Sequence, residues 1–532
     1  MSTTVPIARP RMPTPLGLGL VLALALALRL FASPAATERN MDPDSAHLLN
    51  VARCFERGEG FSNPALWPAW MSPERLPMPE TFKEPGDPFA IAMLMRASLS
   101  PFGAGVAVSL IGGLLAVLGT WALARNLGFG RGAALAAAFA LAINPHAIQM
   151  SVRVMVDAPF AGLLTGALAA AAWRAGSTTR PLWLDVATGA LLGAAFLVRG
   201  FTLVAIPAVL VALVRPPVPR LGTWMRSAVV MALAAAVVAS PFVLRNLRLF
   251  GVPFYSDVGA FGQTPYADVL GIMTSLERPT ASPFEFLLAH LPQVAQHLME
   301  SVYRFGRWTL PNEMAGGVWW MPLLVAGAWK LRRDSAAWPL WAYLGVVLPF
   351  VFAITWDARY FTAAGSCFAV LTGVGAAWLW PRFAARALAG HLRGRHVLIA
   401  AAMVAALAQA VVARTALVRF APAEIAAARA EAAFLRAHLS PDEAVMVFTT
   451  SFYSWFADRP SHYVVVADDA RFESRMQRYR VRYAILPTRE LESLARRYPE
   501  RRLPRALVPL RSDPETGVTV FRVEAAALPD AD

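Results

Sequence analysis

Eleven apolar runs lie within the first 413 residues and limit the chain to a membrane fold. A straight helix needs about 20 consecutive apolar residues to cross the hydrocarbon core. Several runs are shorter, so the sequence predicts the number of helices better than their ends, and the pair of runs around Arg199 could be broken or re-entrant. The runs cover residues 16–32, 103–123, 132–149, 155–173, 184–198, 201–214, 227–244, 317–330, 336–354, 361–379 and 396–413.

The composition agrees with a polytopic membrane protein. Hydrophobic residues make up 57% of the 532 residues and charged residues 16%, against about 25% charged residues in soluble domains. This balance, with a mean hydropathy of +0.47, excludes soluble, disordered and fibrous classes. The two cysteines, Cys54 and Cys367, make neither a metal-binding pattern nor a disulfide framework. Because Cys367 lies inside an apolar run, we expect no bond between them.

The first run has two interpretations. It follows Arg9 and Arg11 and precedes the small residues of FASPAA, as the apolar region of a cleavable signal peptide does. The further runs, and the acidic motif directly behind the first one, favour an uncleaved first span.

The net charge of +14, from 49 basic and 35 acidic residues, is explained by membrane topology. The arginines are scattered between apolar runs instead of forming one basic face with aromatic residues, so we expect no nucleic-acid partner. If the N terminus is cytoplasmic, every cytoplasmic connection is rich in cations. These cations are Arg125, Arg131, Arg174, Arg180, Arg215, Arg220, Arg226, Lys330, Arg332, Arg333, Arg382, Arg386, Arg393 and Arg395.

Eleven spans with a cytoplasmic N terminus place the segments 33–100 and 245–316 and the C terminus on the outer side. After about residue 420 the pattern changes to a polar helix, EIAAARAEAAFLRAHL, followed by strand-like AVMVFTT, YVVVA, VRYAILP and VTVFRVE. We therefore predict a membrane domain at 1–419 and a small α/β periplasmic domain at 420–532. We expect the acidic residues of this second domain not to pair with the membrane motifs.

Acidic residues on the predicted outer side begin with Asp42 and Asp44, about ten residues beyond the first run, in MDPDSAHLLNVAR. An N-cap role for Asp44 is an equally good interpretation of this fragment, because Asp commonly precedes a helix. Lys83, Glu84 and Asp87 surround the Pro-Gly turn of TFKEPGDPF, where a solvated loop is the alternative.

Basic residues on the same side are harder to explain by topology. Arg153 and Asp157, four residues apart in SVRVMVDAPF, could simply pair on one helix. Arg199, Arg245 and Arg359 lie in or beside apolar runs, where an arginine usually faces a polar cavity. Snorkelling to the headgroups is the alternative for each. Together, against the positive-inside bias, they favour a site for an anion.

A separate feature is the segment 245–316, which is rich in Phe, Tyr and Pro. It carries Arg304 and Arg307 near an amphipathic stretch that could lie on the membrane surface.

These motifs, in order and spacing, resemble the C-type glycosyltransferase (GT-C) superfamily, most closely bacterial relatives of the protein O-mannosyltransferases and aminoarabinose transferases. The matching fragments are DSAHLLNVAR, FKEPGDPF, FLVRG, SPFVLRNLRLFGVPF and ARYFTAAG. The resemblance covers roughly residues 16–380 and implies a GT-C fold of about eleven transmembrane helices.

The resemblance implies an inverting glycosyltransferase of the bacterial inner membrane. It would move a sugar from a polyprenyl-phosphate donor to a hydroxyl of a lipid, glycan or protein acceptor on the periplasmic face. Asp44, or else Asp42, would be the general base. The donor phosphate would be bound by Lys83, Arg199, Arg245 and Arg359. Supporting positions would be Glu84, Arg153, Asp157, Asn246 and Tyr360.

One departure concerns a metal. Relatives often have an acidic pair where this chain has Asp44 followed by Ser45, although Asp42 or Asp157 could supply the second carboxylate. No cofactor is certain from the sequence; a divalent metal is possible, and no His/Cys cluster indicates zinc.

Two other classes of function remain. A transporter or flippase of lipid-linked or anionic substrates would also use arginines, but it would place them near the bilayer midplane and often shows two related halves. A non-catalytic scaffold that displays the C-terminal domain would leave the outer aspartates and arginines unexplained.

Overall fold

The computed structural model describes residues 15–177, 181–212, 221–257, 274–276, 288–355, 357–387, 393–420, 422–465, 467–497 and 504–524. The predicted loop cations Arg180, Arg215 and Arg220 lie outside these residues, as do Arg9, Arg11 and most of the segment 258–287.

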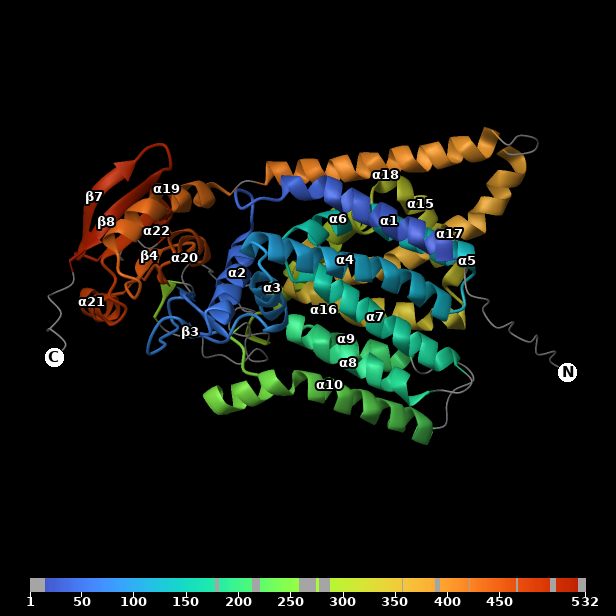
Figure 1. The fold of residues 1–532 in the computed structure, drawn as a ribbon, viewed down its shortest axis with the longest axis horizontal. Coiled ribbons are helices and arrows are strands. Elements are labelled where there is room, and N and C mark those ends of the chain that lie inside the picture. Colours follow the sequence, from blue (N-terminus) through green and yellow to red (C-terminus); the bar gives the residue numbers. More distant parts are fainter. Residues whose placement is uncertain are drawn as a thin grey trace.

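The apolar runs form an elongated bundle of helices that lie roughly along one direction (Figure 1). Ten of the eleven runs each coincide with one helix, and the run 132–149 is divided between two. The helices are α1 (Pro15–Ala32), α4 (Pro101–Asn126), α5 (Arg131–Ile143), α6 (Pro145–Val152), α7 (Asp157–Gly176), α8 (Leu182–Val198), α9 (Thr202–Ala212), α10 (Leu221–Phe250), α15 (Met321–Leu331), α16 (Trp338–Ile354), α17 (Thr362–Ala387) and α18 (Arg393–Arg419).

Fewer helices than eleven meet the length of a straight span. Six described helices are long and apolar enough to cross a membrane, and the bent pair α5 and α6 would be a seventh. The bend of 59° occurs where Asn144 caps α6 and Pro145 occupies its first turn, because a proline there cannot continue the hydrogen bonds of α5. The chain is thus a multi-pass membrane protein, and eleven crossings stay a prediction.

Small residues let the central helices approach closely. A Cβ atom added at Gly112 of α4 would overlap the backbone of Pro159 in α7, and one at Gly162 of α7 would lie 2.5 Å from the Gly112 carbonyl oxygen. Without a hydrophobic driving force between helices in lipid, such close backbone packing is what stabilises the pair.

Arg29 in α1 is a charge inside the bundle that the sequence analysis did not single out. It is fully buried and donates hydrogen bonds to the carbonyl oxygens of Ala25 and Ala142, each at 3.1 Å. Ala142 lies in the last turn of α5, where the helix dipole is negative. Arg29 Nη1 therefore ties α1 to the end of α5, whereas Nε and Nη2 have no hydrogen-bond partner among the described residues.

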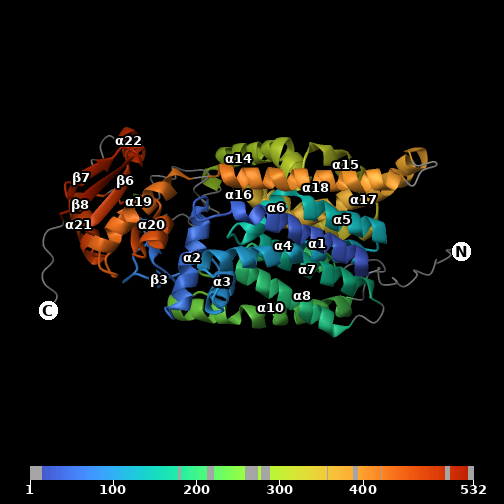
Figure 2. The same ribbon diagram turned by 45° about the horizontal axis from the view of Figure 1, so that its top comes forward.

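One end of the bundle carries the segments that matter for the site. Helices α2 (Pro43–Glu56) and α3 (Gly86–Arg96) lie at this end, next to the C-terminal domain, whereas the described N terminus lies at the other end (Figures 1 and 2). The short strands β1 (Ser62–Asn63) and β3 (Met78–Pro79) pair antiparallel between these helices.

The C-terminal part is a six-stranded mixed sheet with helices. The strand order is β2-β5-β4-β6-β8-β7, with parallel pairs from β2 to β6 and antiparallel pairs from β6 to β7. The strands are β2 (Ala65–Leu66), β4 (Val445–Val447), β5 (Ser461–Tyr463), β6 (Tyr483–Pro487), β7 (Leu507–Asp513) and β8 (Val518–Val523), and the helices are α19 (Ala423–His438), α20 (Thr450–Ala457), α21 (Asp469–Arg478) and α22 (Thr488–Arg497).

The sequence predicted α19 and the strands β4, β6 and β8, and placed YVVVA at the end of β5 and just beyond it. It did not predict β7, or β2, which comes from the loop before α3. Two short apolar residues in a loop carry no periodic signal, so the pairing of β2 with β5 becomes visible only in the fold.

The expected separation of the C-terminal acidic residues from the membrane motifs is wrong. Asp458 accepts hydrogen bonds from Arg53, the last residue of the motif DSAHLLNVAR, at 3.0 Å and from Arg57, directly after α2, at 2.8 Å. Asn50 of α2 also donates to the carbonyl oxygen of Ser451. A single apolar core joins α2 and α3 to α19 and α20, so α2 is held partly by the C-terminal domain.

Candidate functional site

The N-terminus of α2 is capped by Asp42. Its Oδ1 accepts a hydrogen bond from the backbone N–H of Asp44 at 2.9 Å, and Ser45 Oγ accepts from the backbone N–H of Asp42, which completes a capping box. The capping interpretation of Asp44 is therefore wrong, because the cap lies two residues earlier and the Asp44 side chain is left for other contacts.

Asp44 lies between two cations from distant parts of the chain. Its Oδ1 accepts a hydrogen bond from Lys83 Nζ at 2.8 Å, and its Oδ2 accepts one from Arg359 Nη1 at 2.6 Å. All three side chains keep access to solvent, with exposed fractions of 30%, 26% and 24%. Partial burial disfavours the ionised carboxylate, but Lys83 and Arg359 outweigh it and hold the pKa of Asp44 well below its usual range.

Asp42 behaves differently from its neighbour. Burial, together with the negative charge of Asp44, raises the pKa of the Asp42 carboxyl. Two adjacent carboxyls thus have environments that push their pKa values apart, a pattern typical of acid–base sites.

Lys83 is positioned by Glu80, a residue that the sequence analysis did not single out. Glu80 is fully buried, and its Oε1 accepts hydrogen bonds from the backbone N–H groups of Thr81, Phe82 and Lys83 at 3.0, 2.6 and 3.0 Å. Burial opposes the ionised form, but these bonds and His47 lower the pKa of Glu80 to about 2. The turn that presents Lys83 is therefore wrapped around a carboxylate.

His47 ties this turn to α2. Its Nε2 lies 2.8 Å from Glu80 Oε2, which also accepts a hydrogen bond from Asn63 Nδ2 at 2.8 Å. Because His47 and Asp44 both belong to α2, the turn is fixed to this helix at two points. His47 and Glu80 were not predictable as a pair, since neither lies near the other in the sequence.

Arg199 is paired with Asp157. Its Nη1 donates to Asp157 Oδ1 at 2.6 Å, and its guanidinium lies over the Tyr360 ring at 4.3 Å, the same ring that Arg359 approaches at 5.3 Å. Tyr360 belongs to the short helix η6 (Ala358–Phe361). The predicted residues Asp44, Arg199, Arg359 and Tyr360 are thus brought together at one end of the bundle.

The alternative that Arg153 and Asp157 pair on one helix is wrong. Helix α6 ends at Val152 and α7 begins at Asp157, so the two residues do not share a helix and the four-residue spacing does not bring them together. Arg153 instead lies over the Phe420 ring at 4.4 Å and makes no ion pair with any residue that the structure describes.

Two acidic residues of the predicted turn lie behind this cluster. Glu84 accepts a hydrogen bond from the backbone N–H of Gly200 at 2.7 Å, and so fixes the turn to the end of α8; burial raises its pKa. Asp87 is buried, and burial together with the charge of Asp157 raises its pKa to about 7. A solvated loop is therefore not the environment of either side chain.

Arg245 lies apart from Asp44. It donates to the carbonyl oxygen of Phe61 at 3.2 Å and to Asn246 Oδ1 at 2.9 Å, and its guanidinium lies over the rings of Phe61 and Phe250 at 4.8 and 5.5 Å. Asn246 in turn donates to the carbonyl oxygens of Pro253 and Tyr255. Arg245 makes no ion pair within the described part of the chain.

The described residues do not fit a resident metal. No three His, Cys, Asp or Glu side chains among them come together in a way that could hold a metal ion. The positively charged partners of Asp44 occupy the positions that a cation would take.

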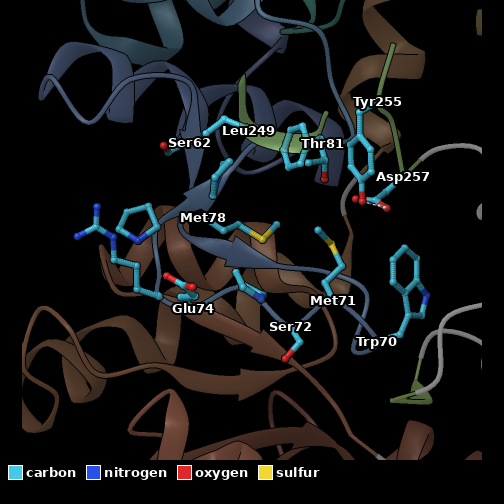
Figure 3. A pocket seen from close by; sticks show the side chains of 15 residues that line it. Ser62, Trp70, Met71, Ser72, Glu74, Met78, Thr81, Leu249, Tyr255 and Asp257 are labelled. Carbon is cyan, nitrogen blue, oxygen red and sulfur yellow. Dashed lines mark hydrogen bonds between the residues drawn. The ribbon is translucent and has the colours of Figure 1, made fainter. Parts of the chain in front are cut away.

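A cavity of about 590 Å³ opens beside this end of the bundle (Figure 3). We call it the turn cavity. It is lined by Ser62, Trp70, Met71, Ser72, Pro73, Glu74, Arg75, Pro77, Met78, Pro79, Thr81, Leu249, Phe250, Tyr255 and Asp257. Thr81 belongs to the turn that presents Lys83, and Phe250 to the ring pair that holds Arg245, so the cavity borders both groups.

Comparison with known proteins finds one partial match to a family model and a set of solved structures with a similar fold. Residues 83–244 match the family model of the dolichyl-phosphate-mannose-protein mannosyltransferases, less than a third of the chain. Lys83 is the first residue matched, and Asp44 and Arg359 lie outside. The comparison with curated proteins finds no match.

Solved GT-C structures share the fold at low sequence identity. ArnT from Cupriavidus metallidurans in the apo state has 16% identity and a TM-score of 0.61, over 96% of this chain and 99% of that one. ArnT bound to undecaprenyl phosphate gives 15% identity and 0.59, over 98% and 100%. AglB from Archaeoglobus fulgidus, in complex with an inhibitory peptide and a dolichol-phosphate, gives 14% and 0.62, over 97% and 74%.

Proposed function

We propose that this chain, which has the fold of the C-type glycosyltransferases, transfers a sugar from a polyprenyl-phosphate donor to a hydroxyl acceptor with inversion at the anomeric carbon. The observation that carries the proposal is Asp44 held between Lys83 and Arg359. One carboxylate and two cations, drawn from α2, from the turn before α3 and from η6, meet at the end of the bundle and remain accessible. A sugar-phosphate transfer needs these groups: a base for the acceptor and cations for the departing phosphate.

The donor phosphate binds by replacing Asp44 as the partner of Lys83 and Arg359. Its oxygens compete with Asp44 for Lys83 and Arg359, and Arg199 lies over the Tyr360 ring that Arg359 also approaches. The lipid-phosphate complexes of ArnT and AglB support a ligand of this chemistry. Arginine suits the role because its fork of N–H donors matches the phosphate geometry.

The same exchange activates the base. While Lys83 and Arg359 hold it, Asp44 has a depressed pKa and accepts a proton poorly. When the phosphate takes both cations, Asp44 loses its partners and gains a neighbouring anion, so its pKa rises. Asp44 is then a base only in the donor complex.

In the reaction itself, the acceptor hydroxyl oxygen attacks the anomeric carbon while the bond between that carbon and the phosphate oxygen breaks. Asp44 takes the hydroxyl proton, and the electron pair leaves on the polyprenyl phosphate, where Lys83 and Arg359 stabilise it. One displacement inverts the anomeric centre, and no nucleotide is consumed.

Lys83 offers a test with a matched control, because the chain has only one other lysine, Lys330, on the exposed part of α15. Purified protein in detergent is incubated with a radiolabelled polyprenyl-phosphate sugar and a soluble acceptor. We expect label transfer, reduced roughly 100- to 1,000-fold in Lys83→Ala, since one stabilising donor at a developing charge contributes about that much. Lys330→Ala should retain activity. Donor uptake into vesicles without label transfer would instead indicate a flippase.

The orientation is proposed from the cation pattern: N terminus in the cytoplasm, and the Asp44 end of the bundle and the C-terminal domain in the periplasm of a bacterial inner membrane. Reporter fusions at Arg333 and at Glu424 should report cytoplasm and periplasm respectively. The same compartment for both fusions would contradict this topology.

A further inference from the structure

His146 is a buried titratable side chain that the transfer reaction, as proposed, does not use. It lies in the first turn of α6 and is 5% exposed. Its Nδ1 lies 2.7 Å from Glu313 Oε2, and its Nε2 lies 2.9 Å from Thr362 Oγ1. Both ring nitrogens therefore have a defined partner, and the two partners come from distant parts of the chain.

The hydroxyl group of Thr362 connects His146 to Arg359. Thr362, the first residue of α17, donates its hydroxyl proton to the carbonyl oxygen of Arg359 at 2.7 Å, since a carbonyl can only accept. The hydroxyl oxygen then accepts from His146, which places a proton on Nε2. A second proton is shared between Nδ1 and Glu313 Oε2. A continuous series of hydrogen bonds thus runs from Glu313 through His146 and Thr362 to the backbone of η6.

Arg359 is held at its backbone and at its side chain. Asp357 accepts from the backbone N–H of Arg359 at 3.1 Å and pairs with its Nε at 3.0 Å, whereas Thr362 holds its carbonyl oxygen. The Nη1 atom is thereby directed at Asp44. Because a binding group has to stay within about 0.5 Å of its productive geometry, the position of η6 matters for the phosphate.

The other end of the series is a π-helix, η3 (Phe305–Met314), which continues α14 (Leu291–Arg304). Long π-helices are rare, and π-helical turns occur frequently at functional sites. Asn144, the cap of α6, donates from Nδ2 to the carbonyl oxygens of Glu313 and Met314 at 2.7 and 3.3 Å. The break between α5 and α6 therefore holds the end of η3 and places His146 against Glu313.

Simple attachment of η3 to the bundle is the alternative interpretation of these contacts. Asn144 already provides such an attachment, and it does so through the backbone of η3. The bonds of His146 continue beyond that attachment, to the residue whose side chain holds Asp44.

We infer that Glu313 and His146 are positioning residues for Arg359, and that they hold η6, through Thr362, where the Arg359 side chain can take a lipid phosphate. This inference rests on the proposed function for the role of the phosphate, and it makes the donor site depend on the docking of η3 against α6.

Two substitutions of His146 separate attachment from positioning. The side chain of His146→Gln is long enough to place its amide nitrogen near the position of Nε2 and to donate to Thr362. The side chain of His146→Asn is one bond shorter and does not reach Thr362. His438→Asn is the matched control, because Nδ1 of His438 lies 2.8 Å from the carbonyl oxygen of Phe434 in its own helix.

Binding of undecaprenyl phosphate to the full-length protein in detergent is measured by isothermal titration, alongside label transfer. We expect His146→Asn to lower affinity and transfer rate about 10-fold or more, since a misplacement of about 1 Å can cost about 100-fold. His146→Gln and His438→Asn should stay within about 3-fold of the wild type, and the acceptor KM should not change.

A double-mutant cycle with Arg359→Ala gives the readout that attachment alone would not move. Without Arg359, His146→Asn should cause no further loss of affinity, because the residue through which it acts is absent. Its effect on the unfolding temperature should persist. A loss of affinity of equal size with and without Arg359 would overturn the inference.

Thr362 provides a second pair of variants if His146→Asn does not fold. Thr362→Val removes the hydroxyl at nearly constant size, and Thr362→Ser restores it, so the first should lose affinity and the second should keep it. Unchanged affinity in Thr362→Val, or in a folded His146→Asn, would overturn the inference.

The outcomes also separate this inference from the proposed function. Transfer that needs Arg359 but not His146 would refute the positioning role and leave the glycosyltransferase standing. Binding of undecaprenyl phosphate that depends on both residues, in a protein that transfers no sugar, would refute the proposed reaction and support the positioning role.

Discussion

Two groups of arginines lie at the same end of the bundle, and their positive charges are compensated in different ways. Around Asp44, each cation has a carboxylate partner, because Arg199 holds Asp157 and Arg359 holds both Asp44 and Asp357. Arg153 instead lies over the Phe420 ring, and Arg245 lies over the Phe61 ring and donates to a backbone carbonyl oxygen. Neither arginine has an ion pair among the described residues.

The difference separates two ways of binding an anion. In the paired group, a phosphate must displace a carboxylate, so its binding is coupled to the release of a base. In the unpaired group, a phosphate would compensate the charge of the arginine without releasing a carboxylate. A site for chemistry is therefore expected at the paired group, and a site that only holds the ligand at Arg245.

The difference between the paired and the unpaired arginines should be largest at Arg199. Arg199→Ala removes the ion-pair partner of Asp157, whose side chain is 1% exposed. Removal of one partner of a buried pair costs roughly 3–5 kcal/mol of folding stability. Thermal unfolding in detergent should show this loss. The double variant Arg199→Met with Asp157→Leu should restore stability, because no charge is left unpaired, yet should not restore donor binding. Recovered donor affinity in the double variant would mean that Arg199 serves the fold and not the phosphate.

Replacement of Arg245 should change folding stability little and should mainly lower donor affinity. Arg245→Ala strands no carboxylate among the described residues, so we expect little change in unfolding temperature and a fall in donor affinity of roughly 10-fold, the size expected from one lost hydrogen bond to a charged group. Isothermal titration with the polyprenyl-phosphate donor measures this. Unchanged affinity would leave ring stacking and snorkelling as the account of Arg245.

The helices of the bundle were predictable because their apolar runs are long and the turns between them are polar. The break at Asn144 was not placed, although the following proline is its cause. The same break made the Arg153–Asp157 spacing misleading, since a helical spacing has meaning only within one helix.

The candidate site was predictable where a charge stands out against its surroundings. Asp44, Lys83, Arg199 and Arg359 were identified as charges in the wrong place for topology, and the structure brings them together. Glu80 could not be found this way, because an ordinary loop carboxylate becomes a positioning group only when the backbone of the following residues folds around it.

The most direct test of the account compares Asp44→Asn with Asp42→Asn in the transfer assay and in donor binding. Asn at either position cannot take a proton at neutral pH, and at Asp42 it keeps the helix cap, since Asn caps as well as Asp. The account predicts that Asp44→Asn lowers transfer about 100-fold or more while donor affinity does not fall, because Lys83 and Arg359 lose a competitor for the phosphate. Asp42→Asn should retain transfer. An active Asp44→Asn would contradict the account: with an inactive Asp42→Asn the base would be Asp42, and with both variants active it would have to be sought at Asp157.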